Sequence, residues 1–117
     1  MQDYHECASY IQRVSGVKTV LQGKWSLEIL CAMRTEPVRL SRLMRLIPKA
    51  SKKALRANLR SLESARIVVR RDLSDTLLHV EYDFVDDTRE TVWTILDHLA
   101  VWGKILQARA KVPPSQA

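Results

Sequence analysis

Apolar residues in the first third of the chain recur three and four positions apart, which is the spacing of a helix that packs along one face. Up to about residue 21 they are Tyr10, Ile11, Val14, Val17, Val20 and Leu21. Gly16 is a weak point in this predicted helix, and Gly23 predicts its end. A second helix is predicted over about 25–33, and it ends near Pro37 because the residue before a proline avoids helical backbone angles. Its largely buried residues are expected to be Leu27, Ile29, Leu30 and Met33.

The middle of the chain predicts two helices in close succession. Ser41 is placed to cap a short helix over 42–46, which Pro48 closes. Ser51 is placed to cap a longer helix that runs to about residue 65. About four residues join the two helices. This is the spacing of a helix-turn-helix, although a generic helical hairpin has the same pattern.

The last part of the chain predicts a β-hairpin and a long helix. The apolar run 67–69 and the alternating segment 79–84 flank a polar turn at 74–76. Asp86 or Asp87 then caps a helix whose apolar residues are Val92, Ile95, Leu96, Leu99, Trp102, Ile105 and Leu106. A helix-turn-helix followed by a hairpin is the winged-helix arrangement, so we predict a mainly α fold with a small β-hairpin. The 117 residues favour one domain, with its core at about 17–106 and a frayed tail at 113–117.

Positive charge is concentrated in the middle of the chain. Residues 34–71 contain twelve Lys or Arg and two Glu, whereas residues 1–33 have no net charge and residues 72–117 carry a net charge of −4. A solvated basic face would explain one such helix, but a block of this length favours a surface that binds nucleic acid. Proteins that bind single strands usually place aromatic side chains among the cations, and this block contains none. The block therefore favours double-stranded DNA.

The helix predicted from Ser51 separates its apolar and basic side chains. Its leucines share a narrow stripe, and its cations fall on a neighbouring arc that comprises Lys52, Lys53, Arg56 and Arg60. Cations near a helix N-terminus oppose the helix dipole, and the first acid, Glu63, is at the far end. This arrangement suggests that the arc serves something other than stability.

Several short motifs resemble, in their order along the chain, the HxlR family of bacterial winged-helix regulators, which are relatives of the MarR family. They are Gly23-Lys24-Trp25, Arg39-Leu40-Ser41-Arg42-Leu43, Ile47-Pro48 with Ser51, Leu55 with Leu59-Arg60 and Leu62-Glu63, Val80-Glu81-Tyr82, and Leu96-Asp97 with Leu99-Ala100 and Trp102-Gly103. No single motif is specific, but the ordered set over about 17–106 is. The resemblance implies a sequence-specific transcriptional regulator whose helix from Ser51 enters the major groove.

The chain departs from the family pattern at three places. Many family members have a cysteine thirteen residues before the Trp of the first motif, but this chain has Gln12 there, and Cys7 lies five residues earlier. Lys49 replaces the glycine after Pro48, which makes that turn more basic. The segment 86–89 replaces the usual opening of the last helix. The first departure argues against a thiol sensor of the family type, although Cys7 remains the candidate thiol.

The resemblance also implies which residues of the helix from Ser51 contact DNA. Lys52, Lys53 and Arg56 are candidates for contact with bases or phosphates, and Arg60 is a candidate for contact with the DNA backbone. Ser51 either donates to a phosphate or only caps the helix.

Cations outside this helix are expected to contact phosphates. Arg39, Arg42, Arg45 and Lys49 surround the preceding helix. Arg70 and Arg71 are adjacent in a strand, so they face opposite sides and at most one faces DNA. The hairpin turn is acidic, which argues against insertion of an arginine at its tip into the minor groove. Lys24 either contacts a phosphate or caps the second helix.

The first and last helices carry more apolar surface than a monomer of this size readily buries. We therefore expect a homodimer whose interface contains Ile11, Val14, Ile95, Leu99, Trp102, Ile105 and Leu106. Trp25, Trp93 and Trp102 are interpreted as core or dimer packing. The two cysteines, Cys7 and Cys31, indicate no disulfide framework and favour a reducing, cytoplasmic setting, with Cys31 as inert packing.

Other classes of function have little support in the sequence. No apolar run approaches the ~20 residues that span a bilayer. The residue patterns indicate no metal site, no cofactor and no catalytic arrangement, and they identify no small-molecule effector, although the fold has room for one. The alternative to a DNA-binding regulator is a winged-helix protein-interaction module, of the anti-repressor kind, whose basic face binds an acidic partner.

Overall fold

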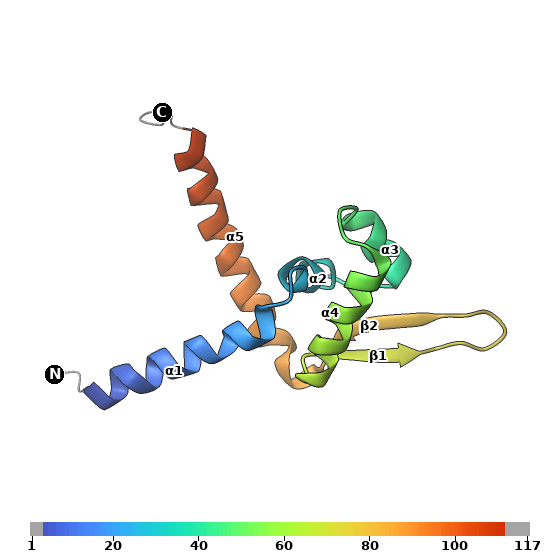
Figure 1. Ribbon diagram of the computed structural model, residues 1–117, viewed down its shortest axis with the longest axis horizontal. Coiled ribbons are helices and arrows are strands. Elements are labelled where there is room, and N and C mark those ends of the chain that lie inside the picture. Colours follow the sequence, from blue (N-terminus) through green and yellow to red (C-terminus); the bar gives the residue numbers. More distant parts are fainter. Residues whose placement is uncertain (1–3, 112–117) are drawn as a thin grey trace. The chain divides into compact units, whose positions relative to one another are not determined.

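The chain forms two compact units, Met1–Val85 and Asp86–Ala117, in the computed structural model (Figure 1). The structure describes residues 4–111, so the predicted tail at 113–117 lies outside it. The first unit contains the helices α1 (Tyr4–Leu21), α2 (Ser26–Ala32), α3 (Leu40–Leu46) and α4 (Lys52–Ser64) and the strands β1 (Val68–Asp72) and β2 (Val80–Phe84). The second unit contains a short 3-10 helix, η1 (Asp86–Thr88), and α5 (Arg89–Lys111). This order confirms the predicted winged helix-turn-helix.

The core of the first unit is an apolar layer to which every element from α2 to β2 contributes. Its fully or almost fully buried residues are Ile29, Leu30, Met33, Val38, Leu43, Leu55, Leu59, Leu62, Val68 and Phe84. Burying one such side chain contributes about 1.5–3 kcal/mol. The leucine stripe predicted for α4 is therefore the side of the helix that packs.

The hairpin is antiparallel and joins the helices through one further backbone pairing. Val68 lies opposite Phe84 and Arg70 lies opposite Tyr82. Val38, just before α3, exchanges two backbone hydrogen bonds with Tyr82, at 2.9 and 2.8 Å. The sheet edge thereby fixes where α3 begins.

Both ends of α4 are stabilised by local hydrogen bonds. As predicted, Ser51 caps the helix, and its Oγ accepts a hydrogen bond from the Ala54 amide at 3.0 Å. At the other end the Ile67 amide donates to the Leu62 carbonyl and the Arg66 amide donates to the Glu63 carbonyl, which is the Schellman pattern. Arg66 has a φ of 62°, the left-handed conformation that glycine usually supplies at this position.

Two of the predicted helix caps are wrong. Helix α3 begins at Leu40 rather than after Ser41, and Arg39 occupies the N-cap position without a side-chain cap. The reason is the pairing of Val38 with Tyr82, which leaves only extended Arg39 between the sheet and the helix. Asp86 and Asp87 lie in η1, one turn before α5, rather than at its cap.

Two side chains of α2 are more exposed than predicted. Leu27 is 40% exposed, and Cys31 is also exposed. Helix α2 is only seven residues long, and it turns Ser26, Ile29 and Leu30 toward the core. At 100° per residue, Leu27 and Cys31 fall outside that arc. In the part of the chain that the structure describes, no helix has the length and apolar character needed to cross a membrane.

Candidate nucleic-acid interface

An open groove of about 710 Å³ lies between α3, α4 and the hairpin. Five of its lining residues are cations that come from three separate elements: Arg39, Lys52, Arg56, Arg60 and Arg70. Glu63 is the acid among its lining residues. We call this surface the basic groove. Its charge and its open form suit a polyanion that lies across it.

Helix α4 supplies three of these cations because of its periodicity. Lys52, Arg56 and Arg60 are spaced four residues apart, so they lie along one flank of the helix, and all three are exposed. The leucine stripe beside them is buried, which fixes the rotation of the helix. Burial of one side of α4 therefore holds the cations toward the hairpin.

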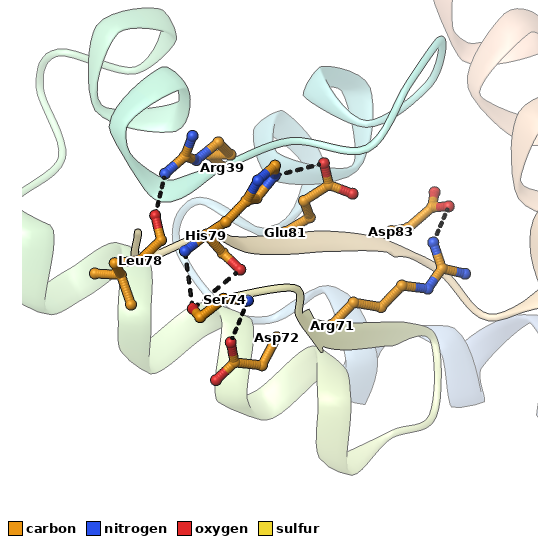
Figure 2. A network of polar contacts seen from close by, with 8 residues as sticks. All are labelled: Arg39, Arg71, Asp72, Ser74, Leu78, His79, Glu81 and Asp83. Atoms are coloured by element: carbon orange, nitrogen blue, oxygen red, sulfur yellow. Dashed lines mark hydrogen bonds and ion pairs between the residues drawn. The ribbon is translucent and has the colours of Figure 1, made fainter. Parts of the chain in front are cut away.

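Arg39 connects the groove to the far end of the hairpin. Its guanidinium donates a hydrogen bond to the Leu78 carbonyl at 3.0 Å (Figure 2). Arg39 leaves the sheet in an extended conformation just before α3. Its side chain therefore holds the loop of the hairpin against the start of α3, in addition to contributing charge.

Arg70 and Arg71 lie on opposite faces of the hairpin, as the alternation of a strand requires. Arg70 lines the basic groove on the same face as buried Val68. Arg71 lies on the other face, and its guanidinium donates to Asp83 Oδ2 at 3.2 Å (Figure 2). Asp83 is 4% exposed. Arg71 therefore neutralises a buried carboxylate, whereas Arg70 faces the groove.

The other predicted DNA-contact residues do not line the groove. Arg42 and Arg45 are exposed on α3, Lys49 is exposed in the turn between α3 and α4, and Lys53 is exposed on α4. Ser51 caps α4. Lys24 lies before α2 with its Nζ 5.2 Å from the centre of the Trp25 ring, which is a cation-π arrangement.

Apolar residues that also line the groove were not predicted from the sequence. They are Leu40, Met44, Leu78, Val80 and Tyr82. Three of these residues alternate along β2 and the residues before it, so the period of two was a usable signal. The groove is therefore lined by apolar side chains as well as by cations.

The end of the hairpin is braced by polar contacts (Figure 2). Asp72 accepts a hydrogen bond from the Ser74 amide at 2.9 Å, and hydrogen bonds from the Ser74 side chain and backbone lower the pKa of Asp72. The His79 amide donates to Ser74 Oγ at 2.9 Å, and His79 Nε2 lies 3.0 Å from Glu81 Oε2. Leu77 and Leu78 are exposed at this end. The acidic turn predicted from the sequence is thus an ordered loop.

The residues predicted for a dimer interface are mostly exposed on their helices. In α1 these are Ile11 and Val14, at 62% and 56% exposure. In α5 the exposed residues are Ile95, Trp102, Ile105 and Leu106, and Leu99 is half-buried. Each helix therefore presents apolar side chains that its own unit leaves accessible.

The two cysteines are both exposed on the surface of the first unit. Cys7 is exposed on α1. Cys31 is exposed on α2, and desolvation, followed by the nearby Glu28 carboxylate, raises the pKa of its thiol. A raised pKa lowers the fraction of reactive thiolate.

Comparison with known proteins agrees with this geometry. The chain is 34% identical over 98 residues to the uncharacterized HTH-type transcriptional regulator YtcD of Bacillus subtilis, covering 84% of this chain and 77% of that protein. An uncharacterized HTH-type transcriptional regulator of Methanothermobacter thermautotrophicus is 31% identical over 96 residues, covering 82% of this chain and 72% of the other. The crystal structure of ytcD matches with a TM-score of 0.73 at 30% identity, over 81% of this chain and 96% of that one.

The model of one family matches most of the chain. It is the HxlR-like helix-turn-helix family, and the match covers residues 20–111. This range contains α2 to β2, which carry the basic groove, and the whole of α5. The relatives named above are HTH-type transcriptional regulators, and the chain itself belongs to the HxlR-like helix-turn-helix family.

Proposed function

We propose that this protein is a sequence-specific regulator of transcription that binds double-stranded DNA as a homodimer. The convergence on one groove of five cations from α4, the hairpin and the residue that precedes α3 carries this proposal. Each cation that neutralises a phosphate releases condensed counterions, and this release supplies much of the affinity of such proteins for DNA. In this proposal the protein acts by binding alone, without a cofactor or a catalytic step, in the cytoplasm.

Helix α4 is proposed to lie in the major groove of the DNA. Its outward side carries Lys53, Ala57 and Arg60, which are all exposed. The small side chain of Ala57 allows the helix backbone to approach base edges, and an alanine methyl can contact a thymine methyl. Lys52 and Arg56, on the flank toward the hairpin, would then contact bases or phosphates. Phosphates would also be contacted by Arg42, Arg45 and Lys49.

The proposed dimer follows from the exposed apolar residues of α1 and α5. Large exposed apolar patches on small proteins usually mark an interface. A two-fold dimer would bury them and present two copies of α4 to the same face of DNA, about one helical turn apart. Sedimentation at tens of micromolar tests this part, and a monomer under those conditions would contradict it.

The decisive experiment for DNA binding is fluorescence anisotropy with a duplex from the protein's own promoter region and a scrambled duplex, over a range of salt concentrations. We expect a steep loss of affinity with salt on both duplexes, at about −0.9 per neutralised phosphate on the log–log plot. We also expect the promoter duplex to stay bound at higher salt. Weak binding to both duplexes at low salt would refute the proposal and favour an acidic protein partner for the basic groove.

A further inference from the structure

Asn58 connects α4 to the turn that follows α1. Its Oδ1 accepts a hydrogen bond at 2.8 Å from the main-chain amide of Trp25, which is 33 residues earlier in the sequence. At 100° per residue, Asn58 lies about 160° around α4 from Arg56. It is therefore on the side of the helix away from the basic groove, where a role in DNA contact does not explain it.

The turn packs closely against Asn58 at Gly23. A Cβ atom at Gly23 would lie 2.6 Å from Ser26 Oγ and 2.7 Å from Asn58 Nδ2. Ser26 is completely buried, and its amide donates to the Gly23 carbonyl at 3.1 Å. The backbone at Gly23 therefore packs directly against the side-chain amide of Asn58. The hydrogen bond from the Trp25 amide fixes the orientation of Asn58 relative to the turn.

This contact links the helix proposed to form the dimer, α1, to the helix proposed to contact DNA, α4. The turn from residue 22 to 25 follows the end of α1, whose apolar residues are proposed to form the dimer. Helix α4 carries the cations that are proposed to contact DNA. We infer that Asn58 is a positioning residue that fixes α4 relative to the end of α1, and thereby sets the spacing of the two half-sites that the dimer accepts. This inference rests on the proposed function.

A directional hydrogen bond suits this task better than apolar packing. Burial of the leucine stripe fixes which side of α4 packs but is non-directional, whereas an amide oxygen must also stay near the line of the donated N–H. One added base pair rotates a half-site by about 35° around the duplex axis, since a turn holds 10–10.5 base pairs. A loosened α4 would therefore follow a displaced half-site that a fixed α4 rejects.

The test compares full-length wild type with Asn58→Ala and Asn58→Asp. Asp retains an acceptor at the position of Oδ1, so it is the conservative variant, and Arg56→Ala is the control for weakened DNA contact. Selection from a random duplex library with the wild-type protein supplies the preferred half-sites. Affinities are then measured on duplexes whose half-site spacing differs by −2 to +2 base pairs. The readout is the ratio of the affinity at the best spacing to the affinity at each other spacing. A change of charge that alters affinity equally at every spacing leaves this ratio unchanged.

We expect the wild type to lose on the order of tenfold in affinity for each base pair of altered spacing, comparable to a mismatched base pair. Asn58→Ala should reduce this discrimination to less than about threefold. Its salt slope should stay at the wild-type value because no phosphate contact is removed. Asn58→Asp should restore the discrimination, and Arg56→Ala should weaken binding at every spacing while it keeps the ratio.

Different results overturn different claims. A folded Asn58→Ala variant, judged by circular dichroism and thermal melting, that keeps the wild-type spacing ratio overturns the inference alone. A wild type that binds a selected site without spacing preference also overturns it. A wild type that selects no sequence and binds no duplex overturns the proposed function, and this inference with it. Should Asn58→Ala fail to fold, the Asn58→Asp ratio decides, because loss of discrimination in that folded variant contradicts the inference.

Discussion

Arg70 and Arg71 are neighbours in β1, yet the structure gives them different tasks and predicts different consequences for their removal. Arg70→Ala removes one cation from the basic groove. If that cation neutralises one phosphate, the slope of the log–log salt plot falls by about 0.9, and affinity at 0.1 M salt falls about eightfold. The fold should keep its stability, because Arg70 is exposed.

Arg71→Ala should act on stability and leave the salt slope unchanged. It removes the guanidinium that lies 3.2 Å from Asp83, whose side chain is 5% exposed. Breaking a fully buried ion pair costs 3–5 kcal/mol. The Arg71 side chain is 40% exposed, so solvent screens the pair and we expect a loss of about 1 kcal/mol. For a chain of this size, that loss lowers Tm by about 4 °C.

The two variants carry the same change of charge, so each is the control for the other. Both measurements use the same protein concentration, because a dimer makes Tm depend on concentration. Anisotropy against salt gives the slope, and thermal melting without DNA gives the stability. Equal reductions of the slope by both variants would refute the assignment of the two hairpin faces. A wild-type salt slope for Arg70→Ala would contradict the proposed contact between this side of the groove and DNA.

Three further changes test the structure. Arg66→Gly should stabilise the protein by about 0.5–1 kcal/mol, because it relieves a side chain held at a φ of 62°, and Arg66→Ala should show no such gain in urea unfolding. Gly23→Ala should cost about 1–3 kcal/mol, since its Cβ would lie 2.6 Å from Ser26 Oγ, and an unchanged midpoint in urea would contradict this packing. Because the folded pKa of Asp72 is lowered by Ser74, its carboxylate stabilises the fold above pH about 4. The stability difference between wild type and Asp72→Ala should therefore shrink as pH falls below that value, and a difference independent of pH would argue against the effect.

The sequence predicted those elements whose formation depends on residues close together along the chain. The leucine and cation arcs of α4, its Ser51 cap and the alternation of β2 all depend on residues within a few positions of one another. These features were confirmed with small shifts of their ends. Five cations of the basic block converge in the groove, so the charge pattern predicted where a basic surface forms on the fold.

Contacts between distant segments account for what the sequence did not predict. The start of α3 depends on the pairing of Val38 with Tyr82, 44 positions later, which no local cap reveals. The role of Gly23 depends on Asn58, although the pattern indicated only a helix stop. A left-handed Arg66 is equally hard to foresee, because the usual signal for such an end is a glycine.

The position of Arg70 in the groove depends both on local alternation along β1 and on the pairing of β1 with β2. Alternation alone puts Arg70 and Arg71 on opposite faces, but the run Ile67-Val68-Val69 is apolar at both parities, so it does not say which face is the core. The register resolves this ambiguity by placing Val68 opposite Phe84, both of them buried. Arg70, two residues after Val68, must then share the face that continues into the groove. A one-residue slip of the hairpin would exchange the two arginines, so the apolar pair Val68 and Phe84 determines which of the two cations lines the groove.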